Sequence, residues 1–115
     1  MLVKKLKNED LLKYEENTRD YGILKFAPQT QKKIKIRYNN PDEIDKDFEI
    51  SSTSNDIIYV RKKELNIESK AGEFIRLTIN APKTIGKYIV SIVIKNKANN
   101  TVEEVLRFHI QVDNS

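Results

Sequence analysis

Short runs in which apolar and polar residues alternate cover most of this chain, and turn-forming residues separate the runs. The clearest run alternates basic with apolar side chains: Lys33, Ile34, Lys35, Ile36, Arg37 and Tyr38. Successive side chains of a β-strand point to opposite faces, so this period of two predicts a strand with one face toward a core. The strand is expected to end at three turn-forming residues, Asn39, Asn40 and Pro41.

Similar patterns recur at nearly even spacing and predict seven or eight short strands. The predicted strands centre on residues 22–26, 33–38, 47–50, 58–60, 65–67, 75–79, 87–95 and 105–112. Turns are expected at residues 69–72 and 96–100, and the second turn joins the last two strands as a hairpin. The body of the chain shows no convincing helix, so the predicted fold class is all-β, an immunoglobulin-like β-sandwich of seven to eight antiparallel strands.

The first twenty residues have a different pattern. Asn8 is a candidate cap for a short helix that would contain Glu9, Asp10, Leu11, Leu12 and Tyr14. We therefore divide the chain into an N-terminal linker or short helix, residues 1–20, and one sandwich domain, residues 21–115. The preferred interpretation is a linker that arrives from a preceding domain. The alternative is a segment that lies against the sandwich and covers an exposed edge.

Composition agrees with a single globular domain. The 115 residues are 38% apolar, and the net charge of +4 is only a mild basic excess. The absence of cysteine favours a reducing intracellular location, in the cytoplasm or cytoskeleton. We expect no signal peptide and no transmembrane segment, because no apolar run approaches the about 20 residues of a membrane span. The sequon at Asn99 is interpreted as a polar loop.

The sequence offers little material for catalysis or for cofactor binding. His109 is the only histidine, and alternation places it on the face opposite to Phe108 and Ile110, so neither a metal site nor a histidine-based triad is expected. Acidic residues cluster between Asp42 and Glu49 without the spacing of a calcium-binding loop, which favours a solvated loop. The three glycines stand apart and form no phosphate-binding loop. We therefore expect no enzyme, no metal and no cofactor.

Several short motifs follow one another in the order found in a known family. They are Asn40-Pro41, Phe48-Glu49-Ile50-Ser51-Ser52, Tyr59-Val60-Arg61, Leu65, Gly72-Glu73, and Ile75-Arg76-Leu77 with Ala81-Pro82. Over residues 22–112 this order resembles a major-sperm-protein-type (MSP-type) domain of the ASH/PapD-like immunoglobulin-like group. Within that superfamily it is most similar to the immunoglobulin-like modules of nephrocystin-type scaffolds of the ciliary transition zone and basal body. Related modules of centrosomal and ciliary proteins come next.

The resemblance implies a noncatalytic adaptor, often one of several sandwiches in a long scaffold. In the related domains of membrane contact-site proteins, a Lys-aromatic-Met-Val run contributes to a groove for acidic FFAT peptides. Lys87-Tyr88-Ile89-Val90 stands at the similar place here, which makes Lys87 and Ile89 candidate contacts. Ser51 replaces the basic residue expected on the third strand and Glu49 adds a negative charge, so FFAT binding itself is not expected.

One candidate surface is basic. It consists of Lys33, Lys35 and Arg37 along one strand, and of Arg76 on a strand predicted to lie beside it. Such a stripe can meet phosphates or an acidic peptide. The small net charge and the lack of a clear aromatic platform argue against nucleic acid as a partner. A merely solvated face is the favoured interpretation.

The second candidate surface is apolar, because the alternation partly fails in the strand from Lys87 to Lys95. Its outward positions Ile89 and Val93 are apolar, and Val105 is expected to face outward on the neighbouring strand. A strand that is apolar on both sides needs a cover. The sequence leaves intramolecular and intermolecular cover open. The candidate covers are a partner protein, a second copy, a neighbouring module, or the N-terminal Leu11, Leu12 and Tyr14.

The predicted function is therefore a noncatalytic protein-interaction module of a larger ciliary or centrosomal scaffold. Its candidate contacts are Lys87, Ile89, Val93 and Val105. The expected partners are other ciliary or centrosomal proteins and neighbouring immunoglobulin-like modules of the same chain. The alternatives are an adaptor domain that binds peptides or phosphates at membranes, and a structural spacer.

Overall fold

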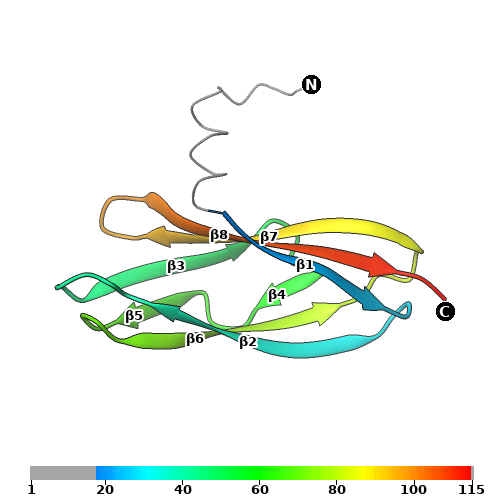
Figure 1. The fold of residues 1–115 in the computed structure, drawn as a ribbon, viewed down its shortest axis with the longest axis horizontal. Helices are drawn as coiled ribbons and strands as arrows, with labels where there is room; N and C mark the ends of the chain where they lie inside the picture. Colours follow the sequence, from blue (N-terminus) through cyan, green and yellow to red (C-terminus); the bar gives the residue numbers. More distant parts are fainter. Residues whose placement is uncertain (1–17, 115) are drawn as a thin grey trace, which may run out of the picture.

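The computed structural model describes residues 18–114, which form eight strands in two facing sheets (Figure 1). The strand order is β1-β8-β7-β3-β5 in one sheet and β2-β6-β4 in the other. The bounds are β1 Thr18–Phe26, β2 Gln31–Asn39, β3 Lys46–Ser52, β4 Ile58–Val60, β5 Glu64–Ile67, β6 Gly72–Asn80, β7 Gly86–Asn96 and β8 Thr101–Val112. The predicted β-sandwich is confirmed. The predicted N-terminal helix lies outside the described residues, none of which forms a helix long and apolar enough to cross a membrane.

β1 departs from the prediction in two ways. It begins at Thr18, so residues 18–20 belong to the sandwich and not to the linker. It also pairs with β8 in parallel, whereas the other described strand pairs are antiparallel. The reason is topological: the turn at residues 27–30 carries the chain into the other sheet, so β1 forms no hairpin with β2 and lies instead beside the last strand.

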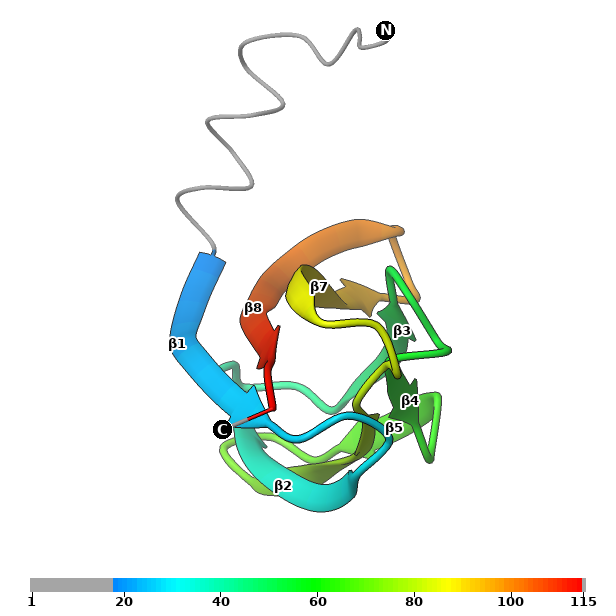
Figure 2. The same cartoon turned by 90° about the vertical axis from the view of Figure 1, so that its right-hand side faces the viewer.

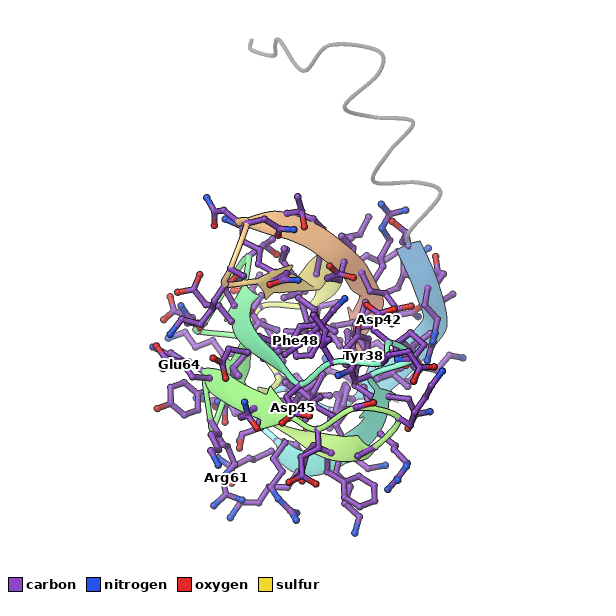
Figure 3. All side chains as sticks on the ribbon, turned by 90° about the vertical axis from the view of Figure 1, so that its left-hand side faces the viewer. Tyr38, Asp42, Asp45, Phe48, Arg61 and Glu64 are labelled. Carbon is purple, nitrogen blue, oxygen red and sulfur yellow. The ribbon has the colours of Figure 1, made fainter. Side chains whose placement is uncertain are left out.

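The core consists of the inward-facing side chains that the alternation of the sequence predicts. The apolar ones on β3 to β8, apart from the partly buried Tyr88, are almost completely buried, as for Ile92 and Leu106. Across the two sheets, the ring of Tyr38 on β2 meets that of Phe48 on β3 edge to face, with centroids 5.4 Å apart. Figure 3 shows Phe48 between the sheets, where it contributes one of the largest buried side chains. Burial of this apolar surface is the main force that holds the sheets together.

Asn40 joins loops at one end of the sandwich. Its side chain is 1% exposed, and Nδ2 donates hydrogen bonds to the carbonyl oxygens of Ile44 at 2.8 Å and Ile67 at 2.9 Å. Its Oδ1 accepts a bond from the backbone N–H of Asp42 at 3.1 Å. The Asn40-Pro41 motif therefore does more than end β2, because it links the following loop to the end of β5.

The acidic loop between β2 and β3 is held by ordinary ion pairs and hydrogen bonds. Asp42 pairs with Lys46, and the Nζ of Lys70 lies 3.2 Å from Oε1 of Glu43. Asp45 accepts a hydrogen bond from a backbone N–H of the β5–β6 turn. Among residues 18–114, no group of three or more histidine or acidic residues comes close enough to hold a metal ion.

The two long sides of the sandwich differ (Figure 2). On one side the chain crosses between the sheets from β4 to β5. The N–H of Ile50 donates to the carbonyl of Lys63 at 2.7 Å, and the N–H of Arg61 donates to that of Arg76 at 3.0 Å, so this side is closed. On the other side, β1 and β2 are the outer strands of their sheets, and they follow one another through the turn at residues 27–30 without pairing as strands. That side is open.

Candidate functional site

The outer face of the five-stranded sheet carries the most exposed apolar candidate. Alternation along β7 buries Val90 and leaves Ile89 facing outward, 65% exposed. Ile23 on β1 is 58% exposed. Both isoleucines lie opposite His109 of β8, one on each side of it. We call these three residues, Ile23, His109 and Ile89, the isoleucine row.

A bulge in β1 places Ile23 in this row. The register with β8 shifts between Asp20 and Ile23, and Gly22 has a φ of 78°, a conformation in which glycine pays no steric penalty. The N–H of Gly22 donates to Oδ1 of Asp20 at 2.7 Å, which stabilises the bend. The extra residue brings Ile23 to the outer face and returns Leu24 to the inner face, opposite Ile110.

Asp20 contacts the histidine of this row. Oδ2 of Asp20 lies 3.0 Å from Nε2 of His109. This hydrogen bond is the main reason why the pKa of Asp20 lies below its ordinary value. The hydrogen bond from the N–H of Gly22 lowers the pKa further. The carboxylate therefore stays ionised at neutral pH and holds the imidazole ring in place beside the two isoleucines.

A small apolar hollow of about 130 Å³ opens at the row. It is lined by Ile23, Lys87, Tyr88, Ile89, His109, Ile110 and Gln111. The hydroxyl of Tyr88, whose side chain packs against the core, donates to the carbonyl oxygen of Thr84 at 2.6 Å. Lys87 is exposed, so a cation stands at the rim of the hollow. This arrangement offers apolar contact with a polar border, and the chemistry that it supports best is binding.

The structure separates Ile89 from the two valines predicted to share its surface. Val93 faces outward but is partly buried, and Val105 is only 6% exposed. Val105 lies in register between Val93 on β7 and Thr18 on β1. Val105 therefore faces away from the core as expected but is covered in the structure, and its part in a partner contact stays a prediction. Ile23, which the sequence pattern does not single out, is exposed instead.

The positions that depart from the FFAT-type groove lie on the same outer face. Ser51 of β3 is opposite Val93, and Glu49 is opposite Lys95. Neither adds a positive charge beside the isoleucine row. Whether Lys87 and Ile89 contact a peptide stays a prediction.

The outer face of the three-stranded sheet carries the four basic candidates. Lys33, Lys35, Arg37 and Arg76 are all exposed, and Lys35 lies directly opposite Arg76, so their two strands are neighbours as predicted. Three of them surround Phe74, which alternation puts on the same face. The Nζ of Lys35 lies 4.5 Å from the ring centroid, and the guanidinium carbons of Arg37 and Arg76 lie at 5.8 and 5.9 Å.

Arg61 adds a fifth cation that the sequence pattern did not single out. With Lys33, Lys35 and Arg76 it borders an open hollow of about 210 Å³, and Figure 3 shows its side chain pointing away from the core. We call these four residues together with Arg37 the basic face, which has five members. Within residues 18–114, none of the five forms an ion pair with a carboxylate. Five of the 21 lysine and arginine residues of the chain therefore lie together on this face.

Solved structures share this fold, whereas no protein-family model and no curated protein matches the sequence. WR4, an MSP family member of C. elegans, is 12% identical with a TM-score of 0.54, over 86% of this chain and 94% of that chain. The ASH/PapD-like domain 7 of human CEP192 is 13% identical with a TM-score of 0.54, over 86% of this chain and 81% of that chain. The chain therefore has the fold of the MSP and PapD-like sandwiches.

The same fold also occurs inside a much larger protein. A family 123 glycoside hydrolase from Clostridium perfringens matches 90% of this chain with a TM-score of 0.66 and 15% identity, but the match covers only 25% of the hydrolase chain. At these identities the likeness shows the fold alone. The finer likeness to nephrocystin-type modules stays a prediction.

Proposed function

We propose that this domain is a noncatalytic protein-interaction module that binds a partner through the isoleucine row. The observation that carries the proposal is the pair of exposed isoleucines, Ile23 and Ile89, that flank His109 on one sheet face. Large apolar side chains that gather on a surface mark interaction sites, since burying them on binding is favourable. Lys87, and Asp20, which is hydrogen-bonded to the central His109, supply the polar border that such interfaces have.

The partners that we propose are ciliary or centrosomal proteins, together with neighbouring immunoglobulin-like modules of a longer chain. Two observations support this. The motif order resembles modules of ciliary scaffolds, and the fold is shared with an ASH/PapD-like domain of human CEP192. A cytoplasmic or cytoskeletal location follows from the same proposal.

A second candidate function is an adaptor for peptides or phosphates. It is favoured by the basic face, whose cations have no carboxylate partner among the described residues. A third candidate, a structural spacer, would need no partner at the isoleucine row.

Affinity capture from ciliated cells tests the first proposal with a matched pair of variants, Ile89→Asp and Ile44→Asp. Ile44 is also 65% exposed but lies in the loop between β2 and β3. We expect a partner that is retained by wild type and by Ile44→Asp but lost from Ile89→Asp, while both variants keep their stability within about 0.5 kcal/mol. A partner that survives Ile89→Asp would contradict the assignment to this face. No specific partner for any form would favour the spacer.

A further inference from the structure

The open side of the sandwich contains an apolar cleft of about 600 Å³ between β1 and β2. Its volume falls within the about 300–1,000 Å³ typical of ligand pockets. The inward-facing residues of β1 and β2 are only partly buried here, whereas Ile75 and Leu77 of the neighbouring β6 are fully buried. The apolar walls of the cleft are Tyr21, Leu24, Phe26, Ile34, Ile36 and Phe108. Within residues 18–114, the core therefore lacks a cover along this side.

A free strand edge borders the cleft. β2 pairs with β6 at nine consecutive positions, and in the described part of the chain no strand pairs with its other edge. The unpaired N–H and C=O groups of an edge strand are a template for another extended segment. The edge of β1 is less suitable, because the bulge at Gly22 interrupts it.

The charges on β2 restrict which segment can pair with it. Lys33, Lys35 and Arg37 project from the outer face of this strand, and Arg76 stands opposite Lys35. Side chains on one face of a strand repeat about every 6.7 Å, and directly opposite side chains on a paired strand lie about 5 Å apart. Like charges at that distance repel, so these cations disfavour pairing with a second copy of β2. An acidic strand is attracted.

We propose that the free edge of β2 binds an extended segment of a partner protein in which acidic and apolar residues alternate. The acidic side chains lie opposite Lys33, Lys35 and Arg37, and the apolar side chains between them enter the cleft. Because successive side chains of a strand point to opposite faces, one strand can contact both the cations and the apolar cleft. A membrane surface or a nucleic acid would use the cations but would leave the apolar cleft empty. The site is separate from the isoleucine row, although Ile23 borders both.

A synthetic peptide tests the proposal on the full chain. The probe alternates glutamate with valine over nine residues, the length of β2. One control has the same residues in an acidic block and an apolar block, and a second carries N-methyl groups on alternate backbone nitrogens, which removes the donors needed for strand pairing. We expect both controls to bind about tenfold more weakly, which is about 1.4 kcal/mol. The largest changes in the NMR amide signals are expected in β2.

Two charge reversals locate the site on the protein. Lys35→Glu is expected to weaken binding of the alternating peptide about tenfold. Lys97→Glu, at an exposed lysine of the β7–β8 loop, is expected to leave it unchanged. Each of the following results would overturn the proposal: no binding of the alternating peptide, equal binding of the block peptide, or a loss on Lys87→Glu in place of Lys35→Glu. Self-association of the chain that the peptide does not disrupt would also overturn it.

Discussion

Asn40 connects separate parts of the chain through one buried amide. Its Nδ2 donates hydrogen bonds to the carbonyl oxygens of Ile44, in the loop after β2, and of Ile67, at the end of β5. A buried polar group that loses its partner costs about 1–3 kcal/mol. Asn40 is therefore a residue at which a single substitution affects several loops.

We expect Asn40→Ala to lower the free energy of unfolding by about 1–3 kcal/mol, because the buried carbonyl oxygen of Ile67 and the partly buried one of Ile44 lose their donor. The measurement is chemical denaturation, with Asn39→Ala as the control. Asn39 is the exposed neighbour, and its replacement should cost less than about 0.5 kcal/mol. Equal losses at the two positions would show that the hydrogen bonds of Asn40 contribute nothing special.

Tyr38 makes stability depend on alkaline pH. Burial raises the pKa of this phenol from 10.0 to about 12, and the negative charge of Glu104 is the second cause of the rise. Between these two pH values the folded state keeps the proton that the unfolded state loses. The stabilising contribution of Tyr38 is therefore complete below pH 10 and is lost as the pH rises toward about 12.

Tyr38→Phe removes this group, so the fall in the free energy of unfolding between pH 10 and about pH 12 should be smaller in the variant than in the wild type. Denaturation of both proteins at several pH values cancels the contributions of the groups that they share. An identical fall in both would mean that the phenol titrates alike in the folded and unfolded states.

The bulge of β1 is the element that assembles the isoleucine row. Gly22 adopts a positive φ, and a Cβ added there would meet no atom within 4 Å, so only the backbone conformation demands glycine. Gly22→Ala is expected to cost about 1 kcal/mol of stability and to weaken a partner bound through Ile23. Gly22→Asn is the matched control, because asparagine tolerates this conformation better. Equal stability of the two variants would contradict this account of the bulge.

The sequence predicts a strand well where the strand's own alternation of apolar and polar residues is clear. β2 is the clearest case, since the alternation of Ile34 and Ile36 with lysines predicts both the strand and its two faces. The start of β1 at Thr18 was not predictable, because residues 18–20 are polar and owe their strand conformation to pairing with the distant β8. The bulge at Gly22 depends on that same pairing.

The candidate surfaces were predictable to a similar degree. Alternation gives the face on which Ile89 and Val105 lie, but exposure depends on neighbouring strands, so the burial of Val105 could not be read from the pattern. The place of Phe74 on the basic face could have been predicted, because Phe74 lies two residues before Arg76 and so shares its face. The place of Arg61 on that face could not be predicted, because Arg61 lies where the chain crosses between the sheets.

The molecule as a whole has one closed side and one open side (Figure 2). Closure comes from the crossing between β4 and β5, whereas the outer strands β1 and β2 leave an apolar cleft between them. The basic face and the isoleucine row lie on different sheets, so the two can be occupied at once. The interaction module that we propose would therefore have two separate surfaces for partners.

Photo-crosslinking in ciliated cells decides whether a partner protein contacts the isoleucine row. A photoreactive residue replaces Ile89 in one form of the protein and Ile44, which is equally exposed at 65%, in another. We expect a discrete protein to be crosslinked from position 89 but not from position 44, and to disappear when Ile23→Asp is added. The same products from both positions, or none from position 89, would contradict the proposal that this face binds a partner.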